Sequence, residues 1–240
     1  MSEDRFLDGR IRVTQPDGGF RAGIDAVLLA ASLVVRSGET LVELGCGAGT
    51  ATLCAAARSP EGRFRGIDID PDMIALAQAN AAANGLAERA AFETGDVALG
   101  HMAGPVDQVF FNPPFFDDPS ALRPPKPGKT RAYLTGDTSL ADWVGAARRL
   151  LKPKGRVTLI HRADRLGDIL TLLQSGWGDV AIRPIHPRAD SAAKRVLVSA
   201  RRDTKGALHL HPPLVLHDDA GGQYSAEAEA ILRGRAGIVM

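Results

Sequence analysis

Short apolar runs alternate along the chain with longer segments whose apolar residues recur every three or four positions. A run of five or six mostly apolar residues is typical of a buried strand, and the longer periodic segments are typical of helices. The predicted strands are 40–44, 64–69, 90–96, 106–111, 156–160, 180–185 and 195–200, and the predicted helices between them are 50–57, 71–83, 139–151 and 165–173. Strands that alternate with helices predict an α/β fold with a mostly parallel sheet.

The N-terminal part of the chain departs from this alternation. Residues 1–22 are polar and rich in glycine, with a short alternating stretch that predicts a strand or a hairpin. Residues 26–35 are apolar on most faces and predict a buried helix, with Asp25 as its N-cap and Gly38 beyond its end. We therefore expect residues 1–38 to form an extension that precedes the sheet.

The C-terminal strands depart from it as well. Strands 180–185 and 195–200 follow each other without a crossover helix, which predicts an antiparallel hairpin at the close of the sheet. No linker is long enough to separate two stable domains. We expect one domain over 1–240, with a seven-stranded core in residues 39–240 that includes a mobile loop at 117–136.

A glycine-rich loop, Gly45-Cys46-Gly47-Ala48-Gly49, joins the first predicted core strand to a helix. Strand, glycine-rich loop and helix make the first half of a nucleotide-binding unit. The spacing is G-x-G-x-G, and an acid, Glu43, precedes it; both suit a ligand without phosphates better than a pyrophosphate. S-adenosylmethionine is such a ligand, although a loop of this kind is also found as a plain turn.

Acidic residues follow the next two predicted strands. Asp68 lies 23 residues after Gly45, a place from which a carboxylate can accept hydrogen bonds from both ribose hydroxyls. Asp70 directly precedes Pro71 and is the better candidate for the N-cap of the next helix, so we assign the ribose to Asp68. Asp96 ends the third strand and can accept from the adenine amine of a cofactor.

The stretch Asn112-Pro113-Pro114-Phe115 ends the fourth predicted strand. Proline lacks the N–H that a central strand needs, so the strand must stop at Asn112, where ligands bind in an open α/β sheet. The Asn112 side-chain oxygen and the Pro113 carbonyl can accept the two N–H bonds of an exocyclic amine, and Phe115 can stack on its ring. This pattern predicts a flat substrate that carries a planar nitrogen.

Charge and composition narrow the class of protein. Lys and Arg number 29 and Asp and Glu 28, which gives a formal net charge of +1 and excludes a strongly basic protein but not a local basic patch. The two cysteines suggest neither a disulfide framework nor a zinc site, and the histidines supply no metal set. The acidic start and the short apolar runs favour a cytoplasmic enzyme without a membrane span.

The ordered set of these motifs resembles the class I S-adenosylmethionine-dependent methyltransferases that modify nitrogen. Residues 20–29, 194–198, 214–216 and 223–228 narrow the resemblance to bacterial valine-tRNA (adenine-N6)-methyltransferases, over nearly the whole chain. The resemblance implies a Rossmann-like fold, S-adenosyl-L-methionine as cofactor, and an adenine in a tRNA anticodon loop as substrate.

The sequence and the resemblance together assign the site. The residues expected at the reacting atoms are Asn112, Pro113 and Phe115. Those expected at the cofactor are Asp25, Glu43, Gly45, Gly47, Gly49, Asp68, Ile69, Asp96 and Asn112. Those expected at the RNA are Pro114, Phe116, Arg123, Lys126, Lys129, Arg131, Lys194 and Arg195, because phosphate contacts need basic side chains; no metal is expected.

Other substrates fit part of this pattern. The Asn-Pro-Pro-Phe stretch alone does not separate adenine from a guanine amine in rRNA or a protein glutamine amide. A small-molecule O-methyltransferase would normally place a base or a metal at a hydroxyl, and the sequence offers neither. A binding module without catalysis would have no use for Asn112 and Phe115 at a strand end.

Overall fold

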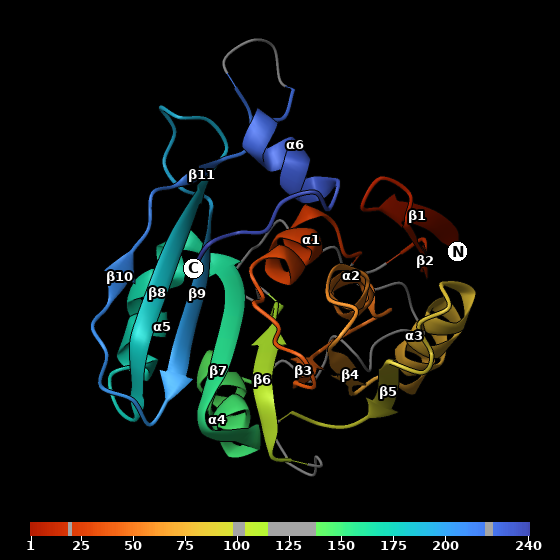
Figure 1. Ribbon diagram of the computed structural model, residues 1–240, viewed down its shortest axis with the longest axis horizontal. Coiled ribbons are helices and arrows are strands. Elements are labelled where there is room, and N and C mark those ends of the chain that lie inside the picture. Colours follow the sequence, from red (N-terminus) through yellow and green to blue (C-terminus); the bar gives the residue numbers. More distant parts are fainter. Residues whose placement is uncertain (19–20, 98–103, 115–137, 219–222) are drawn as a thin grey trace.

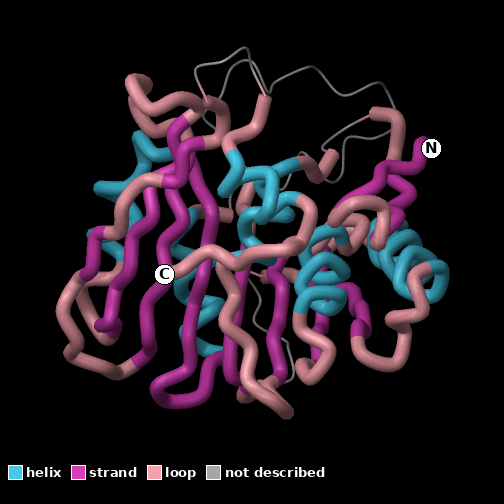
Figure 2. Tube along the Cα trace, turned by 45° about the horizontal axis from the view of Figure 1, so that its top comes forward, coloured by secondary structure: helices cyan, strands magenta, loops and turns pink. Residues whose placement is uncertain are grey.

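A computed structural model describes residues 1–18, 21–97, 104–114, 138–218 and 223–240. Within these ranges a nine-stranded sheet has the order β10-β8-β9-β7-β6-β3-β4-β5, with β11 also paired to β8 (Figure 1). Helices cover both faces of this sheet, and the strands run side by side between them (Figure 2). The predicted α/β architecture is therefore confirmed.

Seven of these strands are the predicted ones. They are β3 (Thr40–Leu44), β4 (Arg63–Asp68), β5 (Ala90–Thr94), β6 (Val106–Phe111), β7 (Leu151–Arg162), β8 (Trp177–His186) and β9 (Arg195–Arg202). The first five are parallel, and β9 is antiparallel to both β7 and β8, so the predicted closing hairpin is correct. The two short strands β10 (His209–Leu210) and β11 (Leu214–Val215) bring the sheet to nine strands, where seven were predicted.

The helices are α1 (Ile24–Ala31), α2 (Thr50–Arg58), α3 (Pro71–Ala83), α4 (Leu140–Leu150), α5 (Leu166–Leu172) and α6 (Ala226–Leu232), with a 3-10 turn (Ala163–Arg165) before α5. The Asp70 side chain caps α3 by accepting from the N–H of Asp72 at 2.8 Å, as predicted. Ser139 and Asp142 form a capping box at the start of α4. Helix α6 was not predicted.

The prediction for the first helix is wrong at both ends. Gly23 occupies the N-cap position without a side-chain bond, and Asp25 lies inside the first turn. The helix stops at Ala31, because the Ser32 hydroxyl donates to the Leu29 carbonyl and the β-branched residues that follow are poor helix formers. Gly38 has a left-handed φ of 78° in a later turn, so it does not end this helix.

Two apolar cores lie on the two faces of the sheet. The fully buried Phe110 and Phe111 of β6 belong to different cores, because successive side chains of a strand point to opposite faces. The core with Phe110 contains α1, α2 and α3, and the core with Phe111 contains α4 and α5 (Figure 1). This arrangement leaves the carboxyl ends of the parallel strands at one edge of the sheet.

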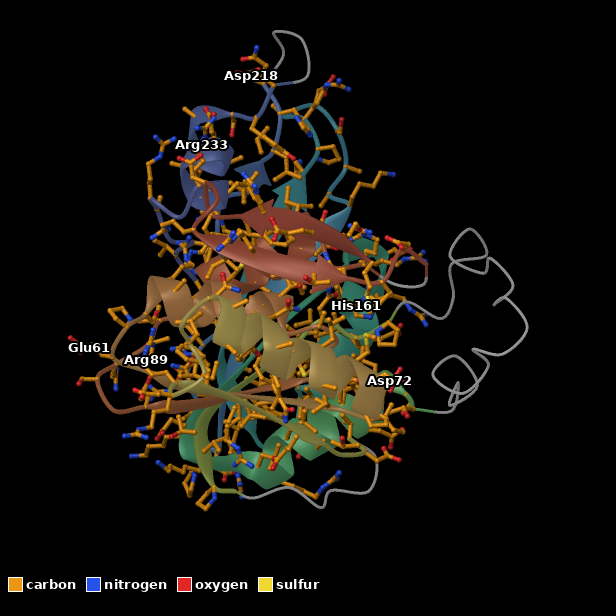
Figure 3. All side chains as sticks on the ribbon, turned by 90° about the vertical axis from the view of Figure 1, so that its right-hand side faces the viewer. Glu61, Asp72, Arg89, His161, Asp218 and Arg233 are labelled. Carbon is orange, nitrogen blue, oxygen red and sulfur yellow. The ribbon has the colours of Figure 1, made fainter. Side chains whose placement is uncertain are left out.

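The N-terminal residues form the predicted hairpin, β1 (Ser2–Phe6) with β2 (Ile11–Gln15). It lies between α3 and α6 in Figure 3, where the labelled Asp72 and His161 mark the side of the molecule at which the parallel strands end. Across the described parts of the chain, no helix has both the length and the apolar character that crossing a bilayer requires.

Candidate functional site

The glycine loop, residues 45–49, is closely packed at both ends and accessible at Gly47. Gly45, Gly47 and Gly49 all have left-handed φ angles, of 64°, 51° and 85°. A Cβ atom at Gly45 would lie 2.5 Å from the Trp143 ring, and one at Gly49 would lie 2.9 Å from the Phe92 ring. A Cβ atom at Gly47 would meet no heavy atom within 4 Å, so a ligand can approach the backbone there.

Asp68 holds this loop from the neighbouring strand. Its two carboxylate oxygens accept from the backbone N–H of Gly47 at 2.8 Å and of Asp70 at 3.0 Å. Burial raises the pKa of Asp68 above its ordinary value, although both backbone N–H groups act in the opposite direction. The carboxylate thus lies at the end of β4 beside the open middle of the loop, where it was predicted. Ile69 follows it and is 41% exposed, which offers an apolar surface at the same edge.

Asn112 leaves the sheet beside the glycine loop. Phe111, the last residue of β6, pairs with Leu44 of β3 on one side and with Leu159 of β7 on the other. Asn112 and Gly45 are therefore the first residues after the ends of two adjacent strands, β6 and β3. Strands β4 and β5 lie on one side of β3, and β6 and β7 lie on its other side. Asn112 and Gly45 therefore flank the point between β3 and β6 where the strand order reverses. Crevices at such points hold the ligands of open α/β sheets.

The side chain of Asn112 has an unusual feature at this edge of the sheet. Its Oδ1 atom is buried and has no hydrogen-bond partner among the described residues. A buried acceptor without a partner is unfavourable, and native structures contain few of them. Pro113 is buried and Pro114 is exposed. An N–H donor on a ligand would satisfy the Asn112 oxygen.

Glu43 contacts the protein itself. Its Oε2 atom accepts from the Thr52 N–H at 2.8 Å and from the Thr52 hydroxyl at 2.5 Å, which ties β3 to helix α2. Burial raises the pKa of Glu43 to about 8. These contacts hold together the two elements, β3 and α2, that the glycine loop connects. A direct contact between Glu43 and the cofactor stays a prediction.

Asp96 lies on the same edge, two residues beyond the end of β5, which stops at Thr94 and not at Asp96 as predicted. The N–H of Gly95, the residue before it, donates to the Asp68 carbonyl at 2.9 Å. That bond keeps Asp96 close to the end of β4. Its contact with adenine stays a prediction.

Two residues assigned to different ligands contact each other. The Nε atom of Arg195 lies 2.9 Å from the Asp25 carboxylate, an ion pair that joins β9 to α1. Asp25 was assigned to the cofactor and Arg195 to RNA. The pair partly neutralises both charges, whereas the neighbouring Lys194 is exposed. The ligand roles of all three residues stay predictions.

Several predicted residues lie outside the described parts of the chain. They are Phe115, Phe116, Arg123, Lys126, Lys129 and Arg131, together with the loop at 117–136. In the rest of the chain, no cluster of three or more His, Cys, Asp or Glu side chains has the arrangement of a metal site.

Two residues that shape the loop were not predicted from the sequence. Trp143 was predicted only as a residue of the helix 139–151. Its ring packs on Gly45 and lies 5.6 Å from the Phe111 ring, and its buried Nε1 has no partner among the described residues. Asn80 donates to the Ala48 carbonyl at 3.0 Å. The sequence signal that could have pointed to it is an asparagine among the apolar positions of the helix 71–83.

Comparisons with known proteins agree with this geometry. Residues 35–176 match the family model of a methyltransferase domain. A tRNA1(Val) (adenine(37)-N6)-methyltransferase of Porphyromonas gingivalis is 32% identical over 95% of this chain and 92% of its own length. A release factor glutamine methyltransferase of Rhodospirillum rubrum is 32% identical over 80% of this chain and 59% of its own length.

A solved structure supports the fold independently. The crystal structure of a protein described as a predicted O-methyltransferase from Agrobacterium tumefaciens superposes with a TM-score of 0.74. It is 23% identical, and the match covers 90% of this chain and 99% of that one. At this identity the likeness concerns the fold alone. The fold and the resemblance predicted from the sequence are both confirmed.

Proposed function

The chain belongs to the family of tRNA1(Val) (adenine(37)-N6)-methyltransferases, and we propose that it methylates the exocyclic N6 amine of an adenine in a tRNA anticodon loop. The observation that carries the proposal is the buried Asn112 Oδ1 atom beside the glycine loop, which has no hydrogen-bond partner within the described part of the chain. An oxygen at that place can accept from a planar amine, which is the group the reaction modifies.

S-adenosyl-L-methionine is the cofactor of this family, and the residues present fit it. Gly47 leaves its backbone accessible, Asp68 places a carboxylate beside it, and Ile69 adds an apolar surface. When bound, the cofactor supplies a methyl group on a positively charged sulfur. We assign its methionine end to the glycine loop and its ribose to Asp68.

The residues of the chain have to orient the target nitrogen. An adenine amine is a weak nucleophile, because its lone pair is delocalised into the ring. Two acceptors, Asn112 Oδ1 and the Pro113 carbonyl, would hold its N–H bonds and leave the lone pair directed at the methyl group. Positioning of two reactants supplies most of the rate, and the acceptors stabilise the nitrogen as it becomes positive. The proton then leaves to water.

The target base has to leave its stack to reach Asn112, which favours a loop or a flipped nucleotide as substrate. Exposed Lys194 can contact phosphate, and the basic residues assigned between 117 and 136 would add to it. A tRNA substrate places the enzyme in the cytoplasm.

A glutamine amide is the second candidate substrate. The specific observation is the similarity to a release factor glutamine methyltransferase, although this chain spans 59% of that relative. A primary amide also carries two N–H bonds on a planar nitrogen, so Asn112 suits it equally well.

The deciding test is transfer of labelled methyl groups to bulk tRNA from a strain that lacks this gene, followed by nucleoside mass spectrometry. N6-methyladenosine is the expected product. Asn112→Ala serves as the inactive control. Label on another nucleoside, or on a release factor and not on tRNA, would overturn the assignment of adenine.

A further inference from the structure

The open edge of the N-terminal hairpin is paired by side chains. Strand β2 pairs with β1 along one edge, and its other edge faces helix α3. Asn84 accepts from the Arg12 N–H at 2.9 Å and donates to the Arg12 carbonyl at 2.6 Å. Asn80 does the same for Thr14, accepting at 2.9 Å and donating at 3.0 Å. Two amides thus take the place of a neighbouring strand.

The spacing of the two elements explains why this works. Alternate residues of a strand lie about 6.8 Å apart and present their N–H and C=O groups to the same edge. Residues four apart on a helix lie about 6 Å apart along its axis and share one face. Asn80 and Asn84 are four apart, and Arg12 and Thr14 are two apart. Each amide therefore meets one backbone N–H and one C=O.

Asn80 makes one bond that Asn84 does not. Its amide nitrogen also donates to the carbonyl of Ala48 at 3.0 Å, at the middle of the glycine loop. The Asn80 side chain is buried, with 3% of the residue exposed. One turn earlier on α3, the Ala77 methyl would lie 3.2 Å from a Cβ atom at Gly49. Helix α3 therefore packs directly on the loop through the face that carries Asn80.

The loop needs such a restraint. Ala48 lies between two glycines, and glycine loses more conformational freedom on ordering than any other residue. Asp68 holds the N–H of Gly47 from the β4 side, and Asn80 holds the carbonyl of Ala48 from the α3 side. Together they restrain the backbone on both sides of the dipeptide Gly47-Ala48, which includes the accessible part of the loop.

We propose that Asn80 is a positioning residue of the cofactor site, which links the docking of the N-terminal hairpin to the conformation of the glycine loop. Loss of its amide would free the Ala48 carbonyl and the Thr14 edge together. By reciprocity, binding at the loop should tighten the hairpin. The proposal depends on the cofactor site and not on the identity of the methylated substrate.

Asn84 provides a matched control. Asn80→Ala and Asn84→Ala each remove two bonds to β2, but only Asn80→Ala removes the bond to the loop. The dissociation constant of S-adenosylmethionine is measured for both by calorimetry without tRNA, beside the melting temperature. We expect Asn80→Ala to bind about tenfold more weakly, as for one lost hydrogen bond of ordinary strength, and Asn84→Ala to bind as the wild type does. Equal affinities in the two variants would overturn the proposal.

A measurement on the wild-type protein covers the case in which Asn80→Ala does not fold. Amide hydrogen exchange of Arg12 and Thr14 is followed by NMR with and without saturating cofactor. The Thr14 amide, which bonds to Asn80, should slow severalfold more than the Arg12 amide, which bonds to Asn84. If both change equally or neither changes, the hairpin and the loop are not coupled through Asn80. A failure here leaves the tRNA assay unaffected, so the two proposals are tested separately.

Discussion

The backbone N–H of Gly47 donates to the Asp68 carboxylate at 2.8 Å, so the last residue of β4 holds the loop that follows β3. Strands β3 and β4 are adjacent and parallel, and the cofactor was predicted at the edge of the sheet where both end. Asp68 therefore supports the loop, and we predict that its remaining lone pairs accept hydrogen bonds from the ribose of the cofactor.

Replacement of Asp68 should weaken cofactor binding. Asp68→Ala removes the acceptor of the Gly47 N–H and the predicted acceptor of the ribose hydroxyls. Leaving polar partners unsatisfied costs about 1–3 kcal/mol each. Asp68→Asn is the matched control, because an amide oxygen can still accept from Gly47 while one ribose acceptor is lost, so we expect a smaller loss of affinity. Calorimetry with S-adenosylmethionine measures both. Wild-type affinity in Asp68→Ala would remove the ribose assignment.

Replacement of Asn112 should abolish transfer and spare cofactor binding. Loss of one preorganised hydrogen-bonding group costs on the order of 10²–10³ in turnover, by analogy with an oxyanion hole. Asn112→Asp should be milder, because a carboxylate still accepts and stabilises a developing positive charge. The measurement is single-turnover transfer to an RNA oligonucleotide at saturating cofactor. A wild-type rate in Asn112→Ala would place the substrate pocket elsewhere.

The buried Glu43 should make stability fall as pH rises. Its pKa is about 8 in the folded protein against 4.5 for the free side chain, so the folded state binds the extra proton between these values. Stability from this group is complete below pH 4.5 and is lost as pH rises through 8, by at most about 1.4 kcal/mol per pH unit. Glu43→Gln cannot titrate.

Urea unfolding of the wild type and of Glu43→Gln at pH 5.5, 7 and 8.5 checks this. The free energy of unfolding of the variant should rise relative to the wild type across the series, because only the wild type loses the contribution of the protonated side chain. A constant difference between the two proteins would show that Glu43 has an ordinary pKa.

Gly45 should tolerate a methyl group less well than Gly47. Both have left-handed φ angles, but only at Gly45 would a Cβ atom collide with Trp143, at 2.5 Å. We expect Gly45→Ala to be less stable than Gly47→Ala by about 1–3 kcal/mol, the usual cost of overpacking. Urea unfolding measures the difference, and Trp143→Phe, which shortens the ring, should reduce it. Equal stabilities would contradict the packing of Trp143 on the loop.

Lys194 and Arg195 should differ in their effect on RNA binding. Lys194 is exposed, whereas the Arg195 guanidinium is already paired with Asp25. A side chain that neutralises one phosphate contributes about 0.7–0.9 to the slope of log affinity against log salt. Lys194→Ala should lower that slope by about this amount, and Arg195→Ala should change it less while lowering the melting temperature. Equal slopes in both variants and the wild type would exclude phosphate contact by either residue.

The sequence alone determined the local features of this protein. The capping of α3 by Asp70 and of α4 by Ser139 involves residues two or three positions apart, so the interacting groups can be read directly from the chain. The positions of the main strands followed from apolar runs, and the antiparallel pairing of β8 with β9 followed from the absence of a crossover helix between them. The Asn112 stretch marked a strand end because proline cannot continue a ladder.

Only the tertiary structure decided which distant residues meet. Asn80 lies 32 positions from Ala48, and Arg195 lies 170 positions from Asp25, so no local pattern relates the members of either pair. The sequence assigned Arg195 to RNA and Asp25 to an N-cap or a cofactor, since both side chains suit those tasks in isolation. The sheet brings α3 and α4 to the glycine loop and β9 to α1, and these contacts follow from that arrangement. Side-chain partners in a folded chain are selected by proximity in space and not by spacing along the sequence.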